Sequence, residues 1–569
     1  MEKGKAPCSR EAQIQRLFLC YASGQTILSA SAIVRFLNFE QVELTANEET
    51  AERLIATYEI EETARESRSM TFGGFMRYME SKDCCAFNQA HTSVYQNMDQ
   101  PLTNYFISSS HNTYLTGDQL IGKSHLNAYI SALKEGCRCI EIDCWDGPDM
   151  EPIVHHGYTL TTKLLFKDVI TTVEQHAFEV SAYPVILSLE NHCSKEQQEV
   201  MAKWLISILG EKLLRSPLDQ PTTGDLPSPN DLKYKILVKN KKLQAEGAAG
   251  TEAEENTDEG EDEDDDEDED EEDEEEEEEE DRQNKAKFWS PRKARPKKKH
   301  KKKVAVVAEA LSDLVVYTRS VKFISFRHSK DKQDFKENTS VAEKKARRLA
   351  KASGADFVQH TQRFLSRIYP AGMRTTSTNY NPQEFWNVGS QLVALNFQTR
   401  DLPMDLNNGR FQDNGGCGYV LKPAVLVSSQ RSFDPNCSQH SLKPTTLMLK
   451  VFGASNLPLS RSGKALDSFV RVEIHGIASD SCRTNTHIVK NNSLSPQWNA
   501  TMKFSISVPE LCLIRLCVRQ QTGFFSSDFV GQYTLPFTSL KKGYRWVPLR
   551  FRDRCSLDPA SLFVFVWHE

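Results

Sequence analysis

A long run of acidic side chains, followed directly by basic ones, interrupts the middle of this 569-residue chain. Residues 252–281 include 26 Asp and Glu, and residues 282–303 include 12 Lys and Arg. A segment of this composition has too few apolar side chains to offset the entropy of ordering it. We therefore expect a disordered, charge-extended linker over residues 244–310, and any fold must be assembled from the sequence on either side of it.

The rest of the chain has the composition of a multidomain protein. Outside the acidic run, the chain has 70 basic and 52 acidic residues. Over the whole chain, 39% of the residues are apolar, which is ample for about three domains. No run reaches the roughly 18 apolar residues that cross a bilayer, and no signal-peptide core follows the N-terminus. The 14 cysteines are scattered, which favours reduced thiols in the cytoplasm or nucleus.

Residues 1–96 carry apolar side chains at helical spacing, as in AQIQRLFLCYA and SASAIVRFLNF. Helices joined by short loops resemble paired EF-hands. The loop YASGQTILSAS at residues 21–31 has no carboxylate, however, and a calcium-binding loop needs several. We predict a degenerate EF-hand-like helical region that does not bind calcium.

Short apolar runs alternate with helical stretches on both sides of the linker. CRCIEIDCW, PVILSLEN and KYKILVKNKK precede it, and LSDLVVYT, VKFISF and VALNFQT follow it. Repeated strands and helices are typical of an α/β barrel of the TIM type. We predict one barrel, split into residues 97–243 and 311–430, with active residues at the C-terminal ends of its strands.

Residues 444–569 differ, because six short runs alternate apolar and polar side chains. They are TTLMLKVFGASNL, SFVRVEIHG, MKFSISV, LIRLCVR, YTLPF and FVFVWHE. Turn residues separate them. This pattern predicts an antiparallel β-sandwich.

Polar side chains recur at alternate positions of three predicted barrel strands. The pairs are Glu141 with Asp143, Lys239 with Lys241, and Arg367 with Tyr369. Residues two apart on a strand share a face. A single Glu-x-Asp pair is usually explained by a nearby cation such as Arg138, but three pairs at one barrel mouth favour a functional site.

The acidic side chains suit a hard cation. Glu141, Asp143 and Glu190 supply carboxylate oxygens, and Asn112 adds an amide oxygen. Oxygen ligands of this kind favour calcium.

The basic side chains suit phosphate chemistry. The cationic side chains of Lys239, Lys241 and Arg367 are suited to binding phosphate groups. His111 and His156 lie in two polar turns. Either histidine alone is more often structural, but together they offer imidazoles for general acid or base chemistry and for stabilising phosphoryl charge.

Nine motifs carry a specific resemblance: SSSHNTYL, CRCIEIDCWDG, HGYTLT, LSLENHCS, ILVKNKK, SRIYP, NPQEFWN, VALNFQT and NGGCGYVLKP. Together they closely resemble the X and Y halves of the catalytic barrel in eukaryotic phosphoinositide-specific phospholipase C. The resemblance extends over residues 1–243 and 311–569. It implies calcium-dependent hydrolysis of phosphatidylinositol 4,5-bisphosphate to inositol 1,4,5-trisphosphate and diacylglycerol, which signals intracellular calcium release.

The resemblance also implies roles for individual residues. The calcium ligands would be Asn112, Glu141, Asp143 and Glu190, and the catalytic residues His111, His156, Glu141 and Glu190. The 4- and 5-phosphates would be bound by Lys239, Lys241, Ser340 and Arg367, with Tyr369 packing on the inositol ring. An apolar ridge that dips into the membrane would consist of Leu120, Tyr158, Leu160 and Met373.

The C-terminal sandwich resembles a C2 domain with a weakened calcium site. Asp467 stands at a calcium-loop position, but Gln520 and Thr522 stand where the delta class has aspartates. Too few carboxylates remain for tight calcium binding. Phe524 and Phe525, at the tip of the third loop, are either core aromatics or side chains that insert into lipid.

Two classes of function fit this resemblance. The first is an active phospholipase C. The weak C2 loop, and the lack of a pleckstrin-homology domain before the helical region, favour the zeta class, the egg-activating sperm type. The acidic linker is instead more like some members of the delta class. The alternative is a catalytically inactive scaffold that binds inositol phosphates or phosphoinositides. The presence of both His111 and His156 argues against this alternative.

The expected partners are calcium and a phosphoinositide-containing membrane surface, and no nucleic acid is expected. The acidic run could contact basic proteins, but a solvated tether is the simpler interpretation. RPKKKHKKK at residues 295–303 fits a nuclear localisation signal that an import receptor would bind. We predict a cytoplasmic protein, peripheral at membranes, with a nuclear location as the alternative.

Overall fold

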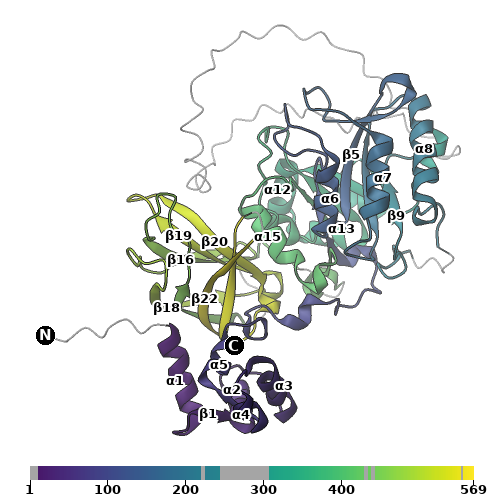
Figure 1. The fold of residues 1–569 in the computed structure, drawn as a ribbon. Helices are drawn as coiled ribbons and strands as arrows, with labels where there is room; N and C mark the ends of the chain where they lie inside the picture. Colours follow the sequence, from purple (N-terminus) through teal and green to yellow (C-terminus); the bar gives the residue numbers. More distant parts are fainter. Residues whose placement is uncertain (1–9, 219–223, 244–306, 429–432, 438–442, 553–554) are drawn as a thin grey trace. The chain divides into compact units, whose positions relative to one another are not determined.

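The computed structural model describes residues 10–218, 224–243, 307–428, 433–437, 443–552 and 555–569 (Figure 1). Residues 244–306, which hold the acidic and basic runs, lie outside the described residues, as do all the predictions that concern them. Within the described ranges, no helix is long and apolar enough to cross a membrane.

The N-terminal region consists of two helix–loop–helix pairs. Its elements are α1 (Arg10–Ala22), β1 (Ile27–Ser29), α2 (Ala30–Phe39), α3 (Glu48–Tyr58), α4 (Glu62–Glu66), β2 (Ser69–Thr71) and α5 (Phe72–Met79). The two loops pair through antiparallel β1 and β2, with Leu28 opposite Met70. Ser29 caps α2 by accepting a hydrogen bond of 3.2 Å from the Ala32 N–H. The prediction of an EF-hand-like helical region is confirmed.

Eight parallel strands form the barrel, four from each side of the linker. They are β4 (Ser109–Ser110), β5 (Cys139–Trp145), β8 (Val185–Asn191), β9 (Ile236–Lys239), β10 (Arg319–Val321), β11 (Glu337–Ala342), β12 (Leu365–Tyr369) and β13 (Leu392–Leu395). The two halves meet where Ala394 pairs with Ser109. At the other junction, Asn240 bridges to Arg319, and its carbonyl accepts the Ser320 N–H at 2.9 Å. The predicted split barrel is confirmed.

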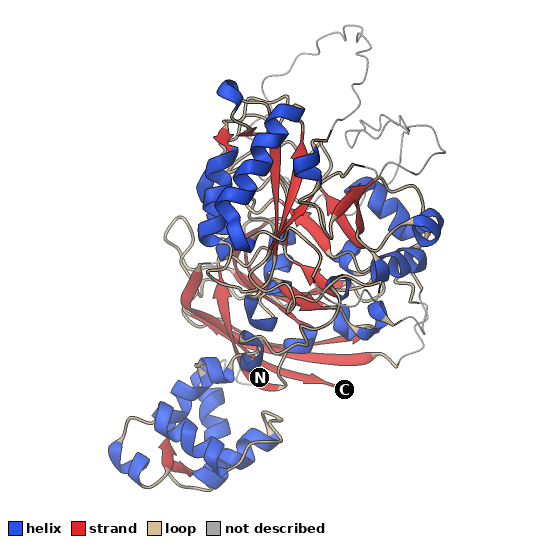
Figure 2. Ribbon diagram, turned by 90° about the vertical axis from the view of Figure 1, so that its right-hand side faces the viewer, coloured by secondary structure: helices blue, strands red, loops and turns tan. Residues whose placement is uncertain are grey.

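Helices flank the barrel strands (Figure 2). They are α6 (Leu126–Lys134), α7 (Phe166–His176), α8 (Lys195–Leu209), α10 (Glu309–Ser312), α11 (Phe326–Lys332), α12 (Glu343–Ala352), α13 (Gly354–Arg363), α14 (Gln383–Trp386), α15 (Leu402–Phe411) and α16 (Ala424–Val427). Four short strands lie outside the ring: β3 (Tyr105–Ile107), β6 (Ile153–Val154), β7 (Leu164–Leu165) and β14 (Tyr419–Leu421). β3 pairs with β14, and β6 and β7 extend the sheet antiparallel from β5.

Two predicted barrel strands differ from the structure. In VKFISF, at residues 321–326, only Val321 belongs to a strand, β10, and Phe326 begins α11. The run LSDLVVYT at residues 311–318 forms the end of α10 and a series of turns. Its apolar side chains Leu311, Leu314 and Val315 pack in the same buried cluster as Met201 and Leu205 of α8. A short apolar run that is mostly buried has no periodicity that distinguishes a strand from a helix.

The C-terminal sandwich has eight antiparallel strands, two more than the sequence pattern predicts. They are β15 (Thr445–Ser455), β16 (Ser468–His475), β17 (Cys482–Asn485), β18 (Gln497–Ile506), β19 (Leu513–Gln521), β20 (Ser527–Pro536), β21 (Gly543–Arg550) and β22 (Ser556–His568). The missed strands are β17, which is exposed along its length, and β21, whose inward positions include Arg545. Neither shows the expected alternation of apolar and polar side chains.

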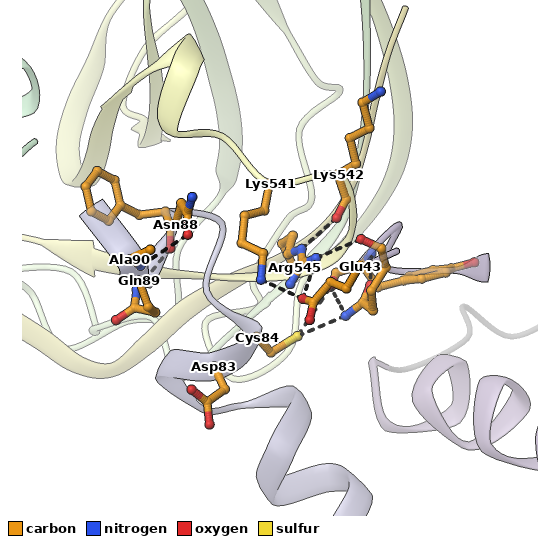
Figure 3. Close-up of polar contacts among 12 residues, drawn as sticks. Glu43, Asp83, Cys84, Asn88, Gln89, Ala90, Lys541, Lys542 and Arg545 are labelled. Carbon is orange, nitrogen blue, oxygen red and sulfur yellow. Dashed lines mark hydrogen bonds and ion pairs between the residues drawn. The ribbon is translucent and has the colours of Figure 1, made fainter. Parts of the chain in front are cut away.

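A buried arginine joins the helical region to the sandwich (Figure 3). The Arg545 side chain is fully buried, and its Nη2 donates to Glu43 Oε1 at 3.1 Å and to the Gln41 carbonyl at 3.0 Å. Lys541 pairs with the same carboxylate at 2.5 Å. Because a buried guanidinium is costly without partners, these contacts hold the two regions together.

A second buried arginine joins the sandwich to the barrel. Arg515 on β19 pairs with Asp405 on α15 at 3.0 Å and with Glu473 on β16 at 2.9 Å. Burial by itself would raise the pKa of Glu473, but the adjacent guanidinium outweighs it and holds this pKa below its usual range. Both neighbouring domains are thus attached to the sandwich by desolvated ion pairs.

The core histidine His360 should make stability depend on pH. Its ring packs among Phe323, Phe326 and Phe364, and burial lowers its pKa to about 4. Between pH 6.5 and 4 the unfolded chain binds the extra proton, so stability falls as pH falls, by up to about 3 kcal/mol. Thermal unfolding of the wild type and His360→Gln over this range should show a steeper decline in the wild type; parallel curves would contradict it.

Candidate functional site

Three carboxylates meet at the C-terminal ends of two adjacent barrel strands. Glu141 and Asp143 lie on β5, Glu190 lies on β8, and the parallel register places Asp143 directly opposite Glu190. One carboxylate oxygen of each lies within 4.8 Å of the other two. Glu141 and Asp143 are buried. Burial, and then the charges of Glu190 and Glu141, raise the pKa of Asp143 well above its usual value.

The residues around this cluster fit a calcium ion. Asp143 Oδ2 accepts a hydrogen bond of 2.5 Å from the Tyr114 hydroxyl, whereas Asp143 Oδ1 is buried without a hydrogen-bond partner among the described residues. Asn112 lies beside the cluster, and its backbone N–H donates to Glu141 Oε2 at 2.8 Å. A hard cation would satisfy the unpaired oxygen and offset three crowded negative charges.

The two histidines of the sequence prediction are held by their Nδ1 atoms. His111 directly follows β4, and its Nδ1 lies 2.8 Å from Asn396 Oδ1. His156 Nδ1 lies 2.6 Å from the backbone carbonyl of Gln119. A carbonyl oxygen only accepts, so each Nδ1 carries a proton and each Nε2 is left for acid or base chemistry. Burial lowers the pKa of His111.

The predicted phosphate-binding residues lie on, or just after, β9, β11 and β12 of the same barrel. Lys239 ends β9 and is buried, and Lys241 follows it. Ser340 on β11 stands opposite Arg367 on β12. Arg367 pairs with Glu141 at 2.6 Å, and its guanidinium lies 5.6 Å from the centre of the Tyr369 ring. The structure therefore links the predicted phosphate-binding and cation-binding residues through one ion pair.

The four predicted ridge residues, Leu120, Tyr158, Leu160 and Met373, are between 50% and 91% exposed. The Leu160 N–H donates to the Leu120 carbonyl at 2.9 Å, which joins two of their loops. The turn at Gly157 packs on Trp145 so closely that a Cβ atom would lie 2.0 Å from the indole ring. That position therefore requires glycine.

Two adjacent phenylalanines are almost fully exposed on the sandwich. Phe524 and Phe525, between β19 and β20, are 90% and 95% exposed. The interpretation of these residues as core aromatics is therefore wrong. In the same group of loops, Asp467 Oδ1 accepts the Asn491 N–H at 2.7 Å.

Three residues that position the site were missed by sequence reasoning. Tyr114 binds Asp143, Asn396 binds His111, and Gln119 binds Asn112 through a 2.8 Å hydrogen bond from Asn112 Nδ2 to Gln119 Oε1. Tyr114 and Asn396 do lie in motifs singled out above, SSSHNTYL and VALNFQT. Their roles depend on partners that only the tertiary structure identifies.

Models of four protein families match the chain. "Phosphatidylinositol-specific phospholipase C, X domain" matches residues 98–242, and the corresponding Y domain matches residues 311–425. "Phosphoinositide-specific phospholipase C, efhand-like" matches residues 8–89, and "C2 domain" matches residues 445–549. The four matches follow the order of the regions described above.

Similar proteins and structures extend over almost the whole chain. "1-phosphatidylinositol 4,5-bisphosphate phosphodiesterase zeta-1" of Homo sapiens is 47% identical over 98% of this chain and 88% of its own length. "1-phosphatidylinositol 4,5-bisphosphate phosphodiesterase delta-4" of Homo sapiens is 46% identical over 98% of this chain and 72% of its own length. The crystal structure of S. officinalis PLC21 has a TM-score of 0.80 and 34% identity, and the match covers 98% of this chain and 68% of that one.

Proposed function

The chain belongs to the phosphatidylinositol-specific phospholipase C family and is a phosphoinositide phospholipase C. From this premise we propose that it hydrolyses phosphatidylinositol 4,5-bisphosphate, with calcium, to inositol 1,4,5-trisphosphate and diacylglycerol. The observation that carries the proposal is the cluster of the Glu141, Asp143 and Glu190 carboxylates, with Arg367 paired to Glu141. His111 and His156, held by Asn396 and by the Gln119 carbonyl, support it. A catalytically inactive scaffold would not need both acid–base groups and the carboxylate cluster.

Calcium held by Asn112, Glu141, Asp143 and Glu190 would lower the pKa of the inositol 2-hydroxyl. Glu141 or Glu190 would then accept the proton, so that the 2-oxygen attacks the 1-phosphate in line. Asn112 is already oriented to bind calcium, because its backbone N–H donates to Glu141 and its side-chain N–H donates to Gln119.

The two histidines have different roles in this proposal. His111, oriented by Asn396, would stabilise the charge of the pentavalent phosphate as an imidazolium, protonated at both nitrogens, whose Nε2–H donates to a phosphoryl oxygen. His156, oriented by the Gln119 carbonyl, would protonate the departing diacylglycerol through Nε2. A cyclic phosphodiester would form first, and the same groups in reverse would add water to it.

The head-group preference follows from the basic side chains. Lys239, Lys241 and Arg367, with the hydroxyl of Ser340, would bind the 4- and 5-phosphates. Ser340 Oγ is buried without a hydrogen-bond partner among the described residues, which suits it to bind a ligand oxygen. The Tyr369 ring would pack on the inositol.

Product analysis tests the proposed reaction. The full chain is incubated with vesicles containing phosphatidylinositol 4,5-bisphosphate or unphosphorylated phosphatidylinositol, over a series of free calcium concentrations. We expect inositol 1,4,5-trisphosphate and diacylglycerol, dependence on calcium, and slower cleavage of the unphosphorylated lipid. Vesicle binding without hydrolysis would support the scaffold instead.

The proposed location is cytoplasmic and peripheral at membranes, with Phe524 and Phe525 entering the lipid interface. Double substitution to serine should weaken binding to phosphatidylcholine–phosphatidylserine vesicles about tenfold or more, because two exposed aromatic rings lose their apolar contact. Vesicle flotation measures this. The matched control is Phe551→Ser, at an exposed aromatic outside the loop; equal losses in both variants would refute a specific role.

We propose that the subtype is zeta-like, because Gln520, near the end of β19, and Thr522, in the loop after it, stand in place of the carboxylates expected for the delta class. Injection of the messenger RNA into unfertilised eggs, with His111→Ala as the control, tests this assignment. Repeated calcium transients from the wild type alone support it. Their absence, when the protein hydrolyses lipid in vitro, would favour a delta-like role.

A further inference from the structure

One buried glutamine connects the calcium-ligand group to an exposed apolar loop. Gln119 is only 6% exposed and immediately precedes Leu120. Its Oε1 accepts from Asn112 Nδ2 at 2.8 Å. Its Nε2 donates to Ser377 Oγ at 2.9 Å and to Asn396 Oδ1 at 3.3 Å. Both the oxygen and the nitrogen of the Gln119 side-chain amide are therefore hydrogen-bonded.

The direction of every hydrogen bond in this network is determined. Asn396 Nδ2 donates to the Thr378 carbonyl at 3.1 Å, so Asn396 Oδ1 must accept from Gln119. Gln119 Oε1 must then accept from Asn112, which leaves Asn112 Oδ1 as the oxygen available to a cation. The same Asn396 oxygen holds His111, and the Gln119 carbonyl holds His156.

On its other side, Gln119 continues into a stiff apolar tip. Leu120 and Ile121 are exposed, yet both of their backbone N–H groups donate to Asp118 Oδ1, at 2.9 and 2.8 Å. The Leu120 carbonyl accepts the Leu160 N–H at 2.9 Å. A displacement of this tip is therefore passed to Gln119, because few free backbone torsions remain to absorb it.

We propose that Gln119 is a positioning residue that couples membrane contact at Leu120 and Ile121 to the affinity of the Asn112, Glu141, Asp143 and Glu190 group for calcium. This inference rests on the proposed function, since a lipid substrate brings the barrel mouth to a bilayer. Lipid bound to the apolar tip restrains the loop and so fixes the position of the Gln119 side-chain amide, which orients Asn112. By linkage, calcium in the site strengthens binding of the tip to the bilayer.

Terbium, a luminescent substitute for calcium, tests the coupling without any turnover. Binding to the full chain is measured alone and with phosphatidylcholine–phosphatidylserine vesicles that contain no phosphoinositide. The signal of Asp143→Asn is subtracted to remove binding elsewhere. For the wild type we expect vesicles to tighten terbium binding about tenfold. For Gln119→Met, which removes the amide at similar length, we expect no response to vesicles.

Gln398→Met is the matched control. Gln398 Nε2 donates to the Gly117 carbonyl of the same loop at 3.2 Å and is not part of the hydrogen-bond network of Gln119, Asn112 and Asn396 described above. Terbium binding to this variant should therefore still tighten when vesicles are added. If Gln119→Met instead binds terbium more weakly but vesicles still tighten that binding as much as in the wild type, Gln119 is only a static support and the proposal fails.

A second variant keeps the proposal testable if Gln119→Met does not fold. Combined Leu120→Ala and Ile121→Ala should leave terbium affinity in solution unchanged and abolish the vesicle response; a preserved response would refute coupling through the tip. Failure of the proposed function appears separately, as a wild type that binds terbium in a vesicle-dependent way without hydrolysing phosphatidylinositol 4,5-bisphosphate.

Discussion

Replacing His111 or His156 by alanine should lower turnover of phosphatidylinositol 4,5-bisphosphate by about 10³-fold, while binding to vesicles is retained. Each ring has its Nδ1 held by a backbone or amide oxygen, so each presents one defined nitrogen to the substrate. Alanine removes the proton carrier but leaves the carboxylate cluster and the exposed apolar loops in place. Initial rates at saturating calcium, with vesicle flotation alongside, measure the two effects.

His155→Ala is the matched control for this experiment. The His155 ring lies 5.6 Å from the Trp145 ring, and its Nδ1 lies 3.0 Å from the backbone carbonyl of His156. It belongs to the same turn but is assigned no chemical step, so most of the activity should remain. Near-normal hydrolysis by His111→Ala or His156→Ala would remove that histidine from the mechanism.

Replacing Asp143 by asparagine should have opposite effects on stability with and without calcium. In the absence of calcium, the variant loses a carboxylate whose pKa is raised by burial and then by the charges of Glu190 and Glu141. Its melting temperature should therefore rise, by the equivalent of about 1–2 kcal/mol. Calcium should then stabilise the variant far less than the wild type, and hydrolysis should need at least about tenfold more calcium.

Thermal unfolding with calcium and with a chelator measures this difference, and Asp149→Asn is the control. Asp149 is exposed and outside the cluster, and asparagine tolerates its positive φ of 54°. A wild-type melting temperature that does not respond to calcium, together with an unchanged response in Asp143→Asn, would exclude these carboxylates as the metal site.

Much of the architecture was predictable because it depends on local patterns. Helical spacing predicts α1 and α2, alternation predicts β16 and β19, and turn-rich segments separate the strands. The errors occurred where local pattern carries little information. LSDLVVYT is buried except at Asp313 and Val316 and folds as a helix and turns, and β17 is an exposed edge strand without an apolar face.

The sequence alone determined the order of the regions, the barrel class and the choice of residues whose side chains gather at its mouth, because motif chemistry and periodicity are local properties. The tertiary structure decided which of them touch. Asn396 reaches His111 across 285 positions and Gln119 across 277, and Arg367 lies against Glu141. Such contacts arise only when β13 pairs with β4 and the barrel is assembled, since no local pattern encodes which distant partner a buried polar group will find.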